Sequence, residues 1–166
     1  MPASPIVNID DLELKSHSNG ENFEASFGTM TPESGAKHLG ARLTVLPPSK
    51  RAWPHHNHHG NDEMFVIMAG EGELRFGDDR FPLKEGDVAT CPAGGRETAH
   101  QIINTGSVDL KYLAISSMRD PDITEYPDSN KLGAIAGSAP GGDLKERTIT
   151  TFVDATGVVD YWEGEE

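Results

Sequence analysis

The chain has 166 residues, of which 27 are Asp or Glu and 14 are Lys or Arg, and its formal net charge is −13 at pH 7. This charge disfavours nucleic acid as a partner, because phosphates are bound by clusters of Lys and Arg. No run of apolar residues approaches the roughly 18 needed to span a bilayer, which disfavours a membrane protein. The length suits one ordinary domain.

The N-terminal part of the sequence gives little structural signal. Residues 1–38 mix short polar segments with Gly and Pro and show no persistent helical periodicity. Residues 1–8 have neither a basic start nor an apolar stretch, unlike a secretory signal. Cys91 is the single cysteine of the sequence and cannot form an internal disulfide, which fits a reducing compartment. These observations predict a cytoplasmic protein.

Short alternating segments separated by Gly and Pro begin at residue 41. The pattern predicts strands over 41–46, 63–69, 73–76, 80–83, 88–91, 100–104 and 110–115. The Gly-Asp-Asp sequence at 77–79 predicts a hairpin turn between two of them. Strands of this length and spacing are typical of an all-β sandwich or barrel.

The pattern weakens after residue 118. Residues 133–142 are rich in Gly, Ala and Pro and predict a flexible loop, whereas residues 147–153 predict one late strand. The chain is therefore divided into an N-terminal extension over 1–40, a β domain over 41–118 and a C-terminal extension over 119–166.

Histidines are concentrated just before the strand at 63–69. Four of them occupy positions 55, 56, 58 and 59, and Glu63 follows a short turn. Residues two apart in an extended strand point the same way, so His56 and His58 can converge on one ion while the next strand returns Glu63 to the same point. Taken alone, the run also fits a solvated, His-rich loop that captures metal adventitiously.

The spacing around these residues resembles a known motif. His56-x-His58, four residues, Glu63, six residues and Gly70 resembles the first motif of the cupin family. In that family this motif supplies two His ligands and one Glu ligand to a metal ion.

A second segment resembles the second cupin motif, which supplies a third His. It runs from Gly86 through Pro92-x-Gly94 to His100, which is followed after three residues by an Asn. The usual motif has two residues between its second Gly and its His, which would place the ligand at Glu97, whereas five residues separate Gly94 from His100. We prefer His100 because it keeps the His-to-Asn spacing and begins an apolar strand; Glu97 is the alternative.

The resemblance covers roughly residues 41–118 and implies a double-stranded β-helix, or jelly-roll barrel, that holds one divalent metal ion. The ligands implied are His56, His58, Glu63 and His100. Three imidazoles and one carboxylate suit Zn, Mn, Fe, Ni or Co. If such an ion is six-coordinate, two positions stay open for a small polar substrate.

Similar small cupins indicate two kinds of reaction, namely isomerisation or epimerisation of a sugar or sugar phosphate, and cleavage by a non-haem iron dioxygenase. A non-catalytic binding or sensing module is the alternative of another class, which the full ligand set and the lack of a helix-turn-helix segment disfavour. The storage proteins of the family tend to duplicate the domain, for which 166 residues leave no room.

Isomerisation needs a group that moves a proton, and Glu97 and Tyr112 are the candidate catalytic residues. Arg42, Arg51 and Arg96 are candidates for binding an anionic substrate, although surface ion pairs are the commoner role of such residues. The resemblance also implies a homodimer that pairs through sheet edges.

Overall fold

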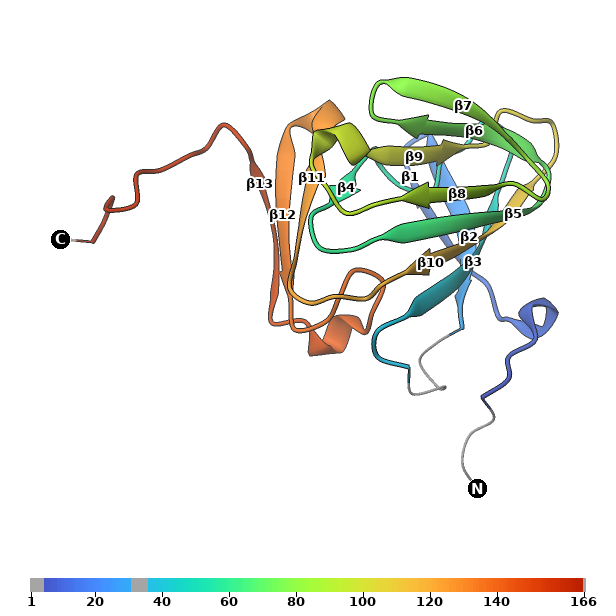
Figure 1. Ribbon diagram of the computed structural model, residues 1–166, viewed down its shortest axis with the longest axis horizontal. Coiled ribbons are helices and arrows are strands. Elements are labelled where there is room, and N and C mark those ends of the chain that lie inside the picture. The colour runs from blue at the N-terminus through green and yellow to red at the C-terminus, as the bar shows by residue number, and fades with distance from the viewer. Residues whose placement is uncertain (1–4, 31–35, 166) are drawn as a thin grey trace.

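The computed structural model describes residues 5–30 and 36–165 of the chain (Figure 1). Within these ranges the fold is all-β, as predicted: the regular elements are β-strands and short 3-10 helices. None of the described helices is long and apolar enough to cross a membrane. In Figure 1 the segment that follows the last strand extends away from the barrel.

The strands are β1 (Lys15–Asn19), β2 (Phe23–Thr29), β3 (Gly40–Leu46), β4 (Asn57–His58), β5 (Glu63–Ala69), β6 (Glu71–Phe76), β7 (Asp79–Lys84), β8 (Val88–Cys91), β9 (His100–Ile103), β10 (Leu110–Ser116), β11 (Asp122–Tyr126), β12 (Lys131–Ala136) and β13 (Ile149–Asp154). The 3-10 helices are η1 (Ile9–Asp11), η2 (Arg96–Thr98), η3 (Pro127–Ser129) and η4 (Leu144–Glu146). The strands form a six-stranded sheet in the order β1-β2-β3-β10-β5-β8, a three-stranded sheet β7-β6-β9 and a four-stranded sheet β13-β12-β11-β4.

The two smaller sheets are joined at one point. His56 and His100 form an antiparallel bridge, in which the His56 N–H donates to the His100 carbonyl at 3.2 Å and the His100 N–H donates to the His56 carbonyl at 2.8 Å. The bridge connects the β4 segment to β9, so the two smaller sheets continue one another. This arrangement is the jelly-roll barrel that the sequence predicts.

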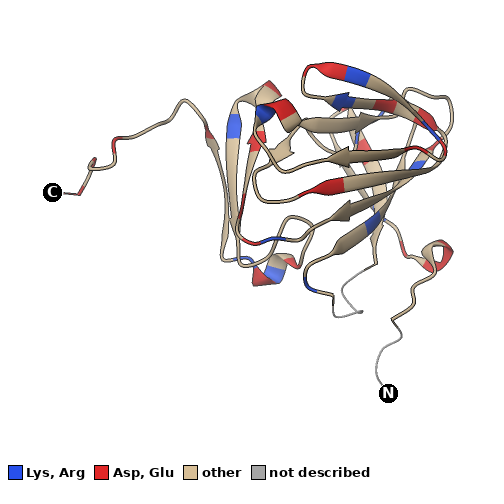
Figure 2. Ribbon diagram, viewed as in Figure 1, with Lys and Arg blue, Asp and Glu red and all other residues tan. Residues whose placement is uncertain are grey.

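The hydrophobic core lies between the sheets and follows from the alternation of each strand. On β5, Phe65 and Ile67 are 7% and 1% exposed, whereas Met64 between Glu63 and Phe65 is 39% exposed. Charged residues are spread over the strands and turns (Figure 2). The buried cluster consists of Ala25, Leu46, Ala52, Phe65, Ile67, Leu74, Leu83, Cys91, Ile102, Leu110 and Tyr112.

The described part of residues 1–38 contains two strands that the sequence pattern does not reveal. Strands β1 and β2 form there and extend the six-stranded sheet beyond β3. All five residues of β1 are exposed, so this edge strand carries none of the apolar alternation that reveals a half-buried strand. Residues 1–4 and 31–35 lie outside the described residues.

The loop predicted over 133–142 is wrong in its first half, because β12 continues to Ala136 and pairs with both β11 and β13. Gly133 has a packing role in this strand. A Cβ atom there would lie 2.5 Å from Thr124 Oγ1 and 2.8 Å from the Phe152 ring. Position 133 therefore holds glycine because neighbouring strands approach it closely, and not because the segment is flexible.

Candidate metal centre

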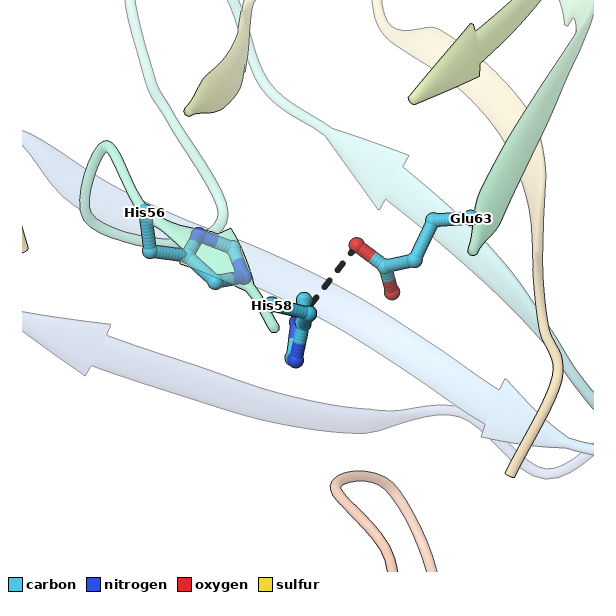
Figure 3. A group of neighbouring side chains, drawn as sticks. All are labelled: His56, His58 and Glu63. Carbon is cyan, nitrogen blue, oxygen red and sulfur yellow. Dashed lines mark ion pairs between the residues drawn. The ribbon is translucent and has the colours of Figure 1, made fainter. Parts of the chain in front are cut away.

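The side chains of His56, His58 and Glu63 lie close together (Figure 3). His56, His58 and Glu63 each offer one ligand atom, and these atoms all lie within 4.8 Å of one another. His58 Nε2 is 3.7 Å from a carboxylate oxygen of Glu63. Asn57, between the two histidines, turns the other way and donates its amide N–H to the Gly94 carbonyl at 2.8 Å. Strand alternation thus brings both imidazoles to one side, as the sequence predicts.

His100 joins this group through Glu63. Its Nε2 atom lies 2.7 Å from Glu63 Oε2, and its ring centroid lies 5.0 Å from that of His56 and 6.3 Å from that of His58. The position on β9 follows from the bridge with His56, because the backbones of the two residues are hydrogen-bonded directly. All four residues implied by the resemblance therefore lie together, with His100 touching the tight group at its carboxylate.

Backbone carbonyls orient two of the three imidazoles. His56 Nδ1 lies 2.8 Å from the Pro54 carbonyl, and His100 Nδ1 lies 3.1 Å from the Thr98 carbonyl. A carbonyl oxygen only accepts, so each Nδ1 atom carries the proton and donates. This fixes the ring orientation and directs Nε2 into the cluster, as is typical of metal-binding histidines.

A buried carboxylate orients the third imidazole. His58 Nδ1 donates to Asp122 Oδ2 at 2.6 Å, and Asp122 also accepts from the Gly60 backbone N–H and the Asn61 amide, both at 2.9 Å. Asp122 is 2% exposed. Burial alone would raise its pKa, but the hydrogen bonds from His58 and Asn61 lower it. Asp122 is therefore an ionised acceptor at neutral pH.

The protonation states of His56 and Glu63 suit cation binding, whereas His100 carries an extra proton. Burial, together with the charges of the neighbouring histidines, lowers the pKa of His56 to about 3, so this imidazole is neutral. Burial alone would raise the pKa of Glu63, but the hydrogen bond from His100 and the nearby imidazoles lower it to about 2. Hydrogen bonds with Cys91 and Glu63 overcome the effect of burial on His100 and raise its pKa to about 10. His100 would have to release a proton to become a ligand.

Two residues of the site escaped sequence reasoning. Asp122 lies 64 positions after His58, and Tyr126 stacks its ring on His56 with centroids 5.9 Å apart. Both belong to β11, which the sequence pattern does not predict. No local spacing connects them to the histidines, so the sequence carries no signal for them.

Neither of the two candidate catalytic residues belongs to the tight group of His56, His58 and Glu63. Glu97 lies on η2, is exposed, and accepts the Gly95 N–H at 3.1 Å. Tyr112 is 2% exposed in the core and packs edge-to-face on Phe65, which itself lies 5.6 Å from the His100 ring. Burial raises the pKa of Tyr112 above its ordinary value, so it is protonated at neutral pH. Their catalytic roles stay predictions.

A hollow of about 360 Å³ lies beside Glu63. Its lining is mostly apolar and does not include the three histidines, so it touches the cluster through Glu63 alone. The lining residues are Leu39, Asp62, Glu63, Met64, Thr90, Cys91, Pro92, Ile115, Ser116 and Ser117.

Comparisons with known proteins agree with this geometry. The sequence model of the family described as "Cupin domain" matches residues 42–116. An oxalate-binding protein of Thermotoga maritima is 37% identical over 83 residues, which cover 48% of this chain and 65% of that protein. The matched segment is thus less than two thirds of the relative's own length.

Solved structures extend the likeness to nearly the whole chain. A proposed sugar phosphate isomerase of Acidithiobacillus ferrooxidans has a TM-score of 0.75 and 23% identity, with 94% of this chain and 96% of that chain covered. A protein named as a predicted oxalate decarboxylase of Thermotoga maritima has a TM-score of 0.60 and 28% identity, with 68% and 97% covered. The motifs, the barrel and these matches agree in one respect: residues 42–116 are similar to the cupin domain, and the chain shares the barrel fold of these proteins.

Proposed function

We propose that this protein is a metal-dependent isomerase or epimerase that acts on a sugar phosphate. The observation that carries the proposal is the convergence of His56, His58 and Glu63 within 4.8 Å, with His100 bound to the same carboxylate. The fold shared with the proposed sugar phosphate isomerase of Acidithiobacillus ferrooxidans supports it at the level of architecture.

The residues present fit a divalent transition metal, because imidazole nitrogen and carboxylate oxygen suit Zn, Mn, Fe, Ni or Co. His56, His58, Glu63 and His100 would hold the ion, and Asp122 would fix the ring of His58 through its Nδ1 hydrogen bond. When bound, the ion supplies Lewis acidity that polarises a carbonyl or hydroxyl oxygen of the substrate. The protein's own task is to orient the substrate and move a proton.

Glu97 and Tyr112 are proposed to move that proton. The exposed Glu97 carboxylate lies on η2, three residues before His100, and the Tyr112 hydroxyl contributes a protonated group from the core side. Positioned acid–base groups contribute about 10²- to 10⁴-fold to rate. Glu97→Gln or Tyr112→Phe should therefore lower kcat by such a factor without changing metal content; an unchanged kcat removes the residue from the proposal.

The function is tested on protein purified without a His tag and analysed for bound metals. The protein loaded with its native metal is then screened against sugar phosphates by NMR, with oxygen uptake followed in parallel. Redox-neutral conversion of a sugar phosphate supports the isomerase. Oxygen consumption by the iron-loaded protein would instead establish the dioxygenase alternative.

The second candidate is a non-catalytic module that binds a small dicarboxylate. It is favoured by the 37% identity to the oxalate-binding protein of Thermotoga maritima. Calorimetric titration of the metal-loaded protein with oxalate measures this directly. Tight binding of oxalate, combined with no turnover of any sugar phosphate, would favour the binding module over the enzyme.

We also propose that the protein is a homodimer and that its location is cytoplasmic. Strand β13 is a sheet edge with Ile149, Phe152 and Val153 each 51% exposed, and the segment after it carries Tyr161 and Trp162, 83% and 71% exposed. An exposed edge strand with apolar side chains invites pairing with another chain. A second copy of this chain, contributing the same edge, would pair with β13 and cover its exposed apolar side chains in a symmetric dimer.

A further inference from the structure

Arg42 occupies an unusual position on the inner side of β3. In the sheet register it lies opposite Thr29 of β2 and Ala114 of β10. Its guanidinium carbon is 4.9 Å from the ring centroid of Phe27 and 5.5 Å from that of Trp53. Stacking on two aromatic rings holds the guanidinium plane in place.

No carboxylate of the described residues pairs with Arg42. Some other arginines of the barrel do have such partners: Arg75 binds Asp128, and Arg96 binds Glu125. A half-buried, unpaired guanidinium is uncommon, because buried charges are normally paired. Acidic side chains are abundant in a chain of net charge −13, so the lack of a carboxylate partner for Arg42 does not come from a shortage of carboxylates.

Arg147 approaches the same place from the C-terminal extension. Its Nη2 atom donates to the Ala139 carbonyl at 3.3 Å, while its Nε atom is buried without a hydrogen-bond partner among the described residues. A Cβ atom built on nearby Gly141 would lie 3.3 Å from Arg42 Nη2. Both guanidinium groups therefore lie against the loop that contains residues 139–141.

Electrostatic interactions link the two arginines to the cluster. The pKa of Arg42 is lowered from its ordinary value, first by burial and also by the charge of Arg147, whereas Glu63 and Tyr112 oppose the shift. Arg147 also acts on Tyr126, the residue that stacks on His56. The sheet register gives the position of Arg42 relative to the cluster: Ala114, opposite Arg42, pairs with Phe65, whose ring centroid lies 5.6 Å from that of His100.

We propose that Arg42 and Arg147 bind the phosphate group of the substrate beside the His–Glu cluster. Two guanidinium groups match the charge of a phosphate monoester dianion and offer paired N–H donors to its oxygens. The unpaired Arg147 Nε–H and the pre-oriented Arg42 fork would supply these donors. The assignment of the phosphate to a substrate rests on the proposed function, whereas the anion site itself does not.

The site is tested first with inorganic phosphate on the full chain after removal of metal with a chelator. Calorimetry should show binding to the wild type that Arg42→Gln and Arg147→Gln each weaken about tenfold or more, as expected for loss of a charge-assisted hydrogen bond. Arg80→Gln, which alters an exposed arginine paired with Glu73, is the matched control and should bind like the wild type. Circular dichroism verifies the fold of each variant.

Phosphate that does not bind the wild type, or that binds folded Arg147→Gln as tightly as the wild type, overturns the proposal. If Arg42→Gln does not fold, Arg42→Lys replaces it, since it keeps the charge but loses the planar fork. An effect of Arg80→Gln equal to that of the other variants would show an adventitious ion only and also reject the site.

Oxalate and an intact sugar phosphate separate the possible outcomes. Oxalate that binds the chelated protein with the same dependence on Arg42 and Arg147 as phosphate would identify a carboxylate site and contradict the assignment to phosphate. In the metal-loaded protein, both arginine variants should raise KM for a sugar phosphate more than they lower kcat. If the arginine variants turn over a sugar phosphate with an unchanged KM, the phosphate site is rejected but the isomerase is not. If the wild type binds phosphate at this site but turns over no sugar phosphate, the isomerase is rejected but the anion site is not.

Discussion

His58 Nδ1 and Asp122 Oδ2 lie 2.6 Å apart in a part of the barrel where both side chains are at most 5% exposed. The pair connects β4 to β11 and determines which nitrogen of His58 faces the other ligands. Because Asp122 is in turn held by Gly60 and Asn61, the imidazole has little freedom to rotate. The C-terminal extension is thereby part of the candidate metal centre.

Asp122→Asn is expected to lower metal affinity by about 10- to 100-fold, because outer carboxylates of this kind orient the ligand and raise its basicity. The measurement is a competition titration with a chelator of known affinity. Asp109→Asn, at an exposed position, serves as control and should leave the affinity unchanged. Equal affinities for Asp122→Asn and the wild type would show that His58 needs no such support.

His100→Ala is expected to lose most of the bound metal, because the ligand set implied by the two motifs would be reduced by one imidazole. Elemental analysis after purification without a tag measures the stoichiometry. His38→Ala, which alters an exposed histidine, is the control. Undiminished metal content in His100→Ala would reject His100 as a ligand and leave the His56, His58 and Glu63 group alone.

Asp128→Asn tests the pair that joins β6 to η3, in which Arg75 donates two hydrogen bonds to Asp128 at 2.7 and 2.9 Å. The pKa of Asp128 lies below its ordinary value, mainly because of Arg75. A carboxylate whose pKa is lowered in the folded state stabilises the fold at any pH above its unfolded-state pKa. This contribution is lost as the pH falls through the folded-state pKa. The carboxylate is 52% exposed, so screening limits the cost at pH 7 to about 1 kcal/mol or less.

Urea denaturation at pH 7 and again below about pH 4 measures the difference between Asp128→Asn and the wild type. We expect the difference to shrink in acid. An Arg75→Gln/Asp128→Asn double variant should cost little more than either single change. A difference that grows as the pH falls would contradict the assigned direction.

Gly70→Ala is expected to destabilise the barrel more than Gly86→Ala does. Both glycines have positive φ, +81° and +89°, so both substitutions strain the backbone. A Cβ atom at Gly70 would also lie 2.5 Å from the Asp109 carbonyl, whereas one at Gly86 meets nothing within 4 Å. Backbone strain alone costs about 1–3 kcal/mol, and Gly70→Ala should exceed Gly86→Ala by a measurable margin in thermal unfolding. Equal losses of stability in the two variants would mean that the backbone at Asp109 moves away from the added Cβ atom at no energetic cost.

Removal of residues 155–166 tests the proposed dimer. The segment carries the exposed Val158, Val159, Tyr161 and Trp162, and its loss should shift the protein toward monomer in size-exclusion chromatography with light scattering. Phe152→Ser on β13 should act in the same direction. Replacement of exposed Val108, which lies before β10, is the control. A full-length chain that runs as a monomer at micromolar concentration would reject the dimer.

The sequence was most informative where the signal is local. Strands such as β5 and β10 were predicted within a residue or two because each is rich in apolar residues and bounded by turn residues, and the convergence of His56, His58 and Glu63 follows from strand alternation and one short turn. The placement of His100 was harder, since the loop before it departs from the family spacing. The structure brings it to the cluster through the backbone bridge with His56.

Features that depend on distant segments escaped prediction. Asp122 and Tyr126 reach the cluster because β11 pairs with β4, and that pairing joins residues more than sixty positions apart. Strand β1 is exposed along its whole length and β12 contains Gly133, so neither shows the usual pattern of a half-buried strand. In each case the partner strand, rather than the local sequence, determines the conformation.

The reciprocal backbone bonds between His56 and His100 have one further consequence. An ion bound by both imidazoles would also hold together the point at which the two smaller sheets join. The same two residues would therefore bind the ion and connect the two sheets. Amide protons at this point should then exchange with solvent more slowly in metal-loaded than in chelated protein, and the melting temperature should rise along with occupancy.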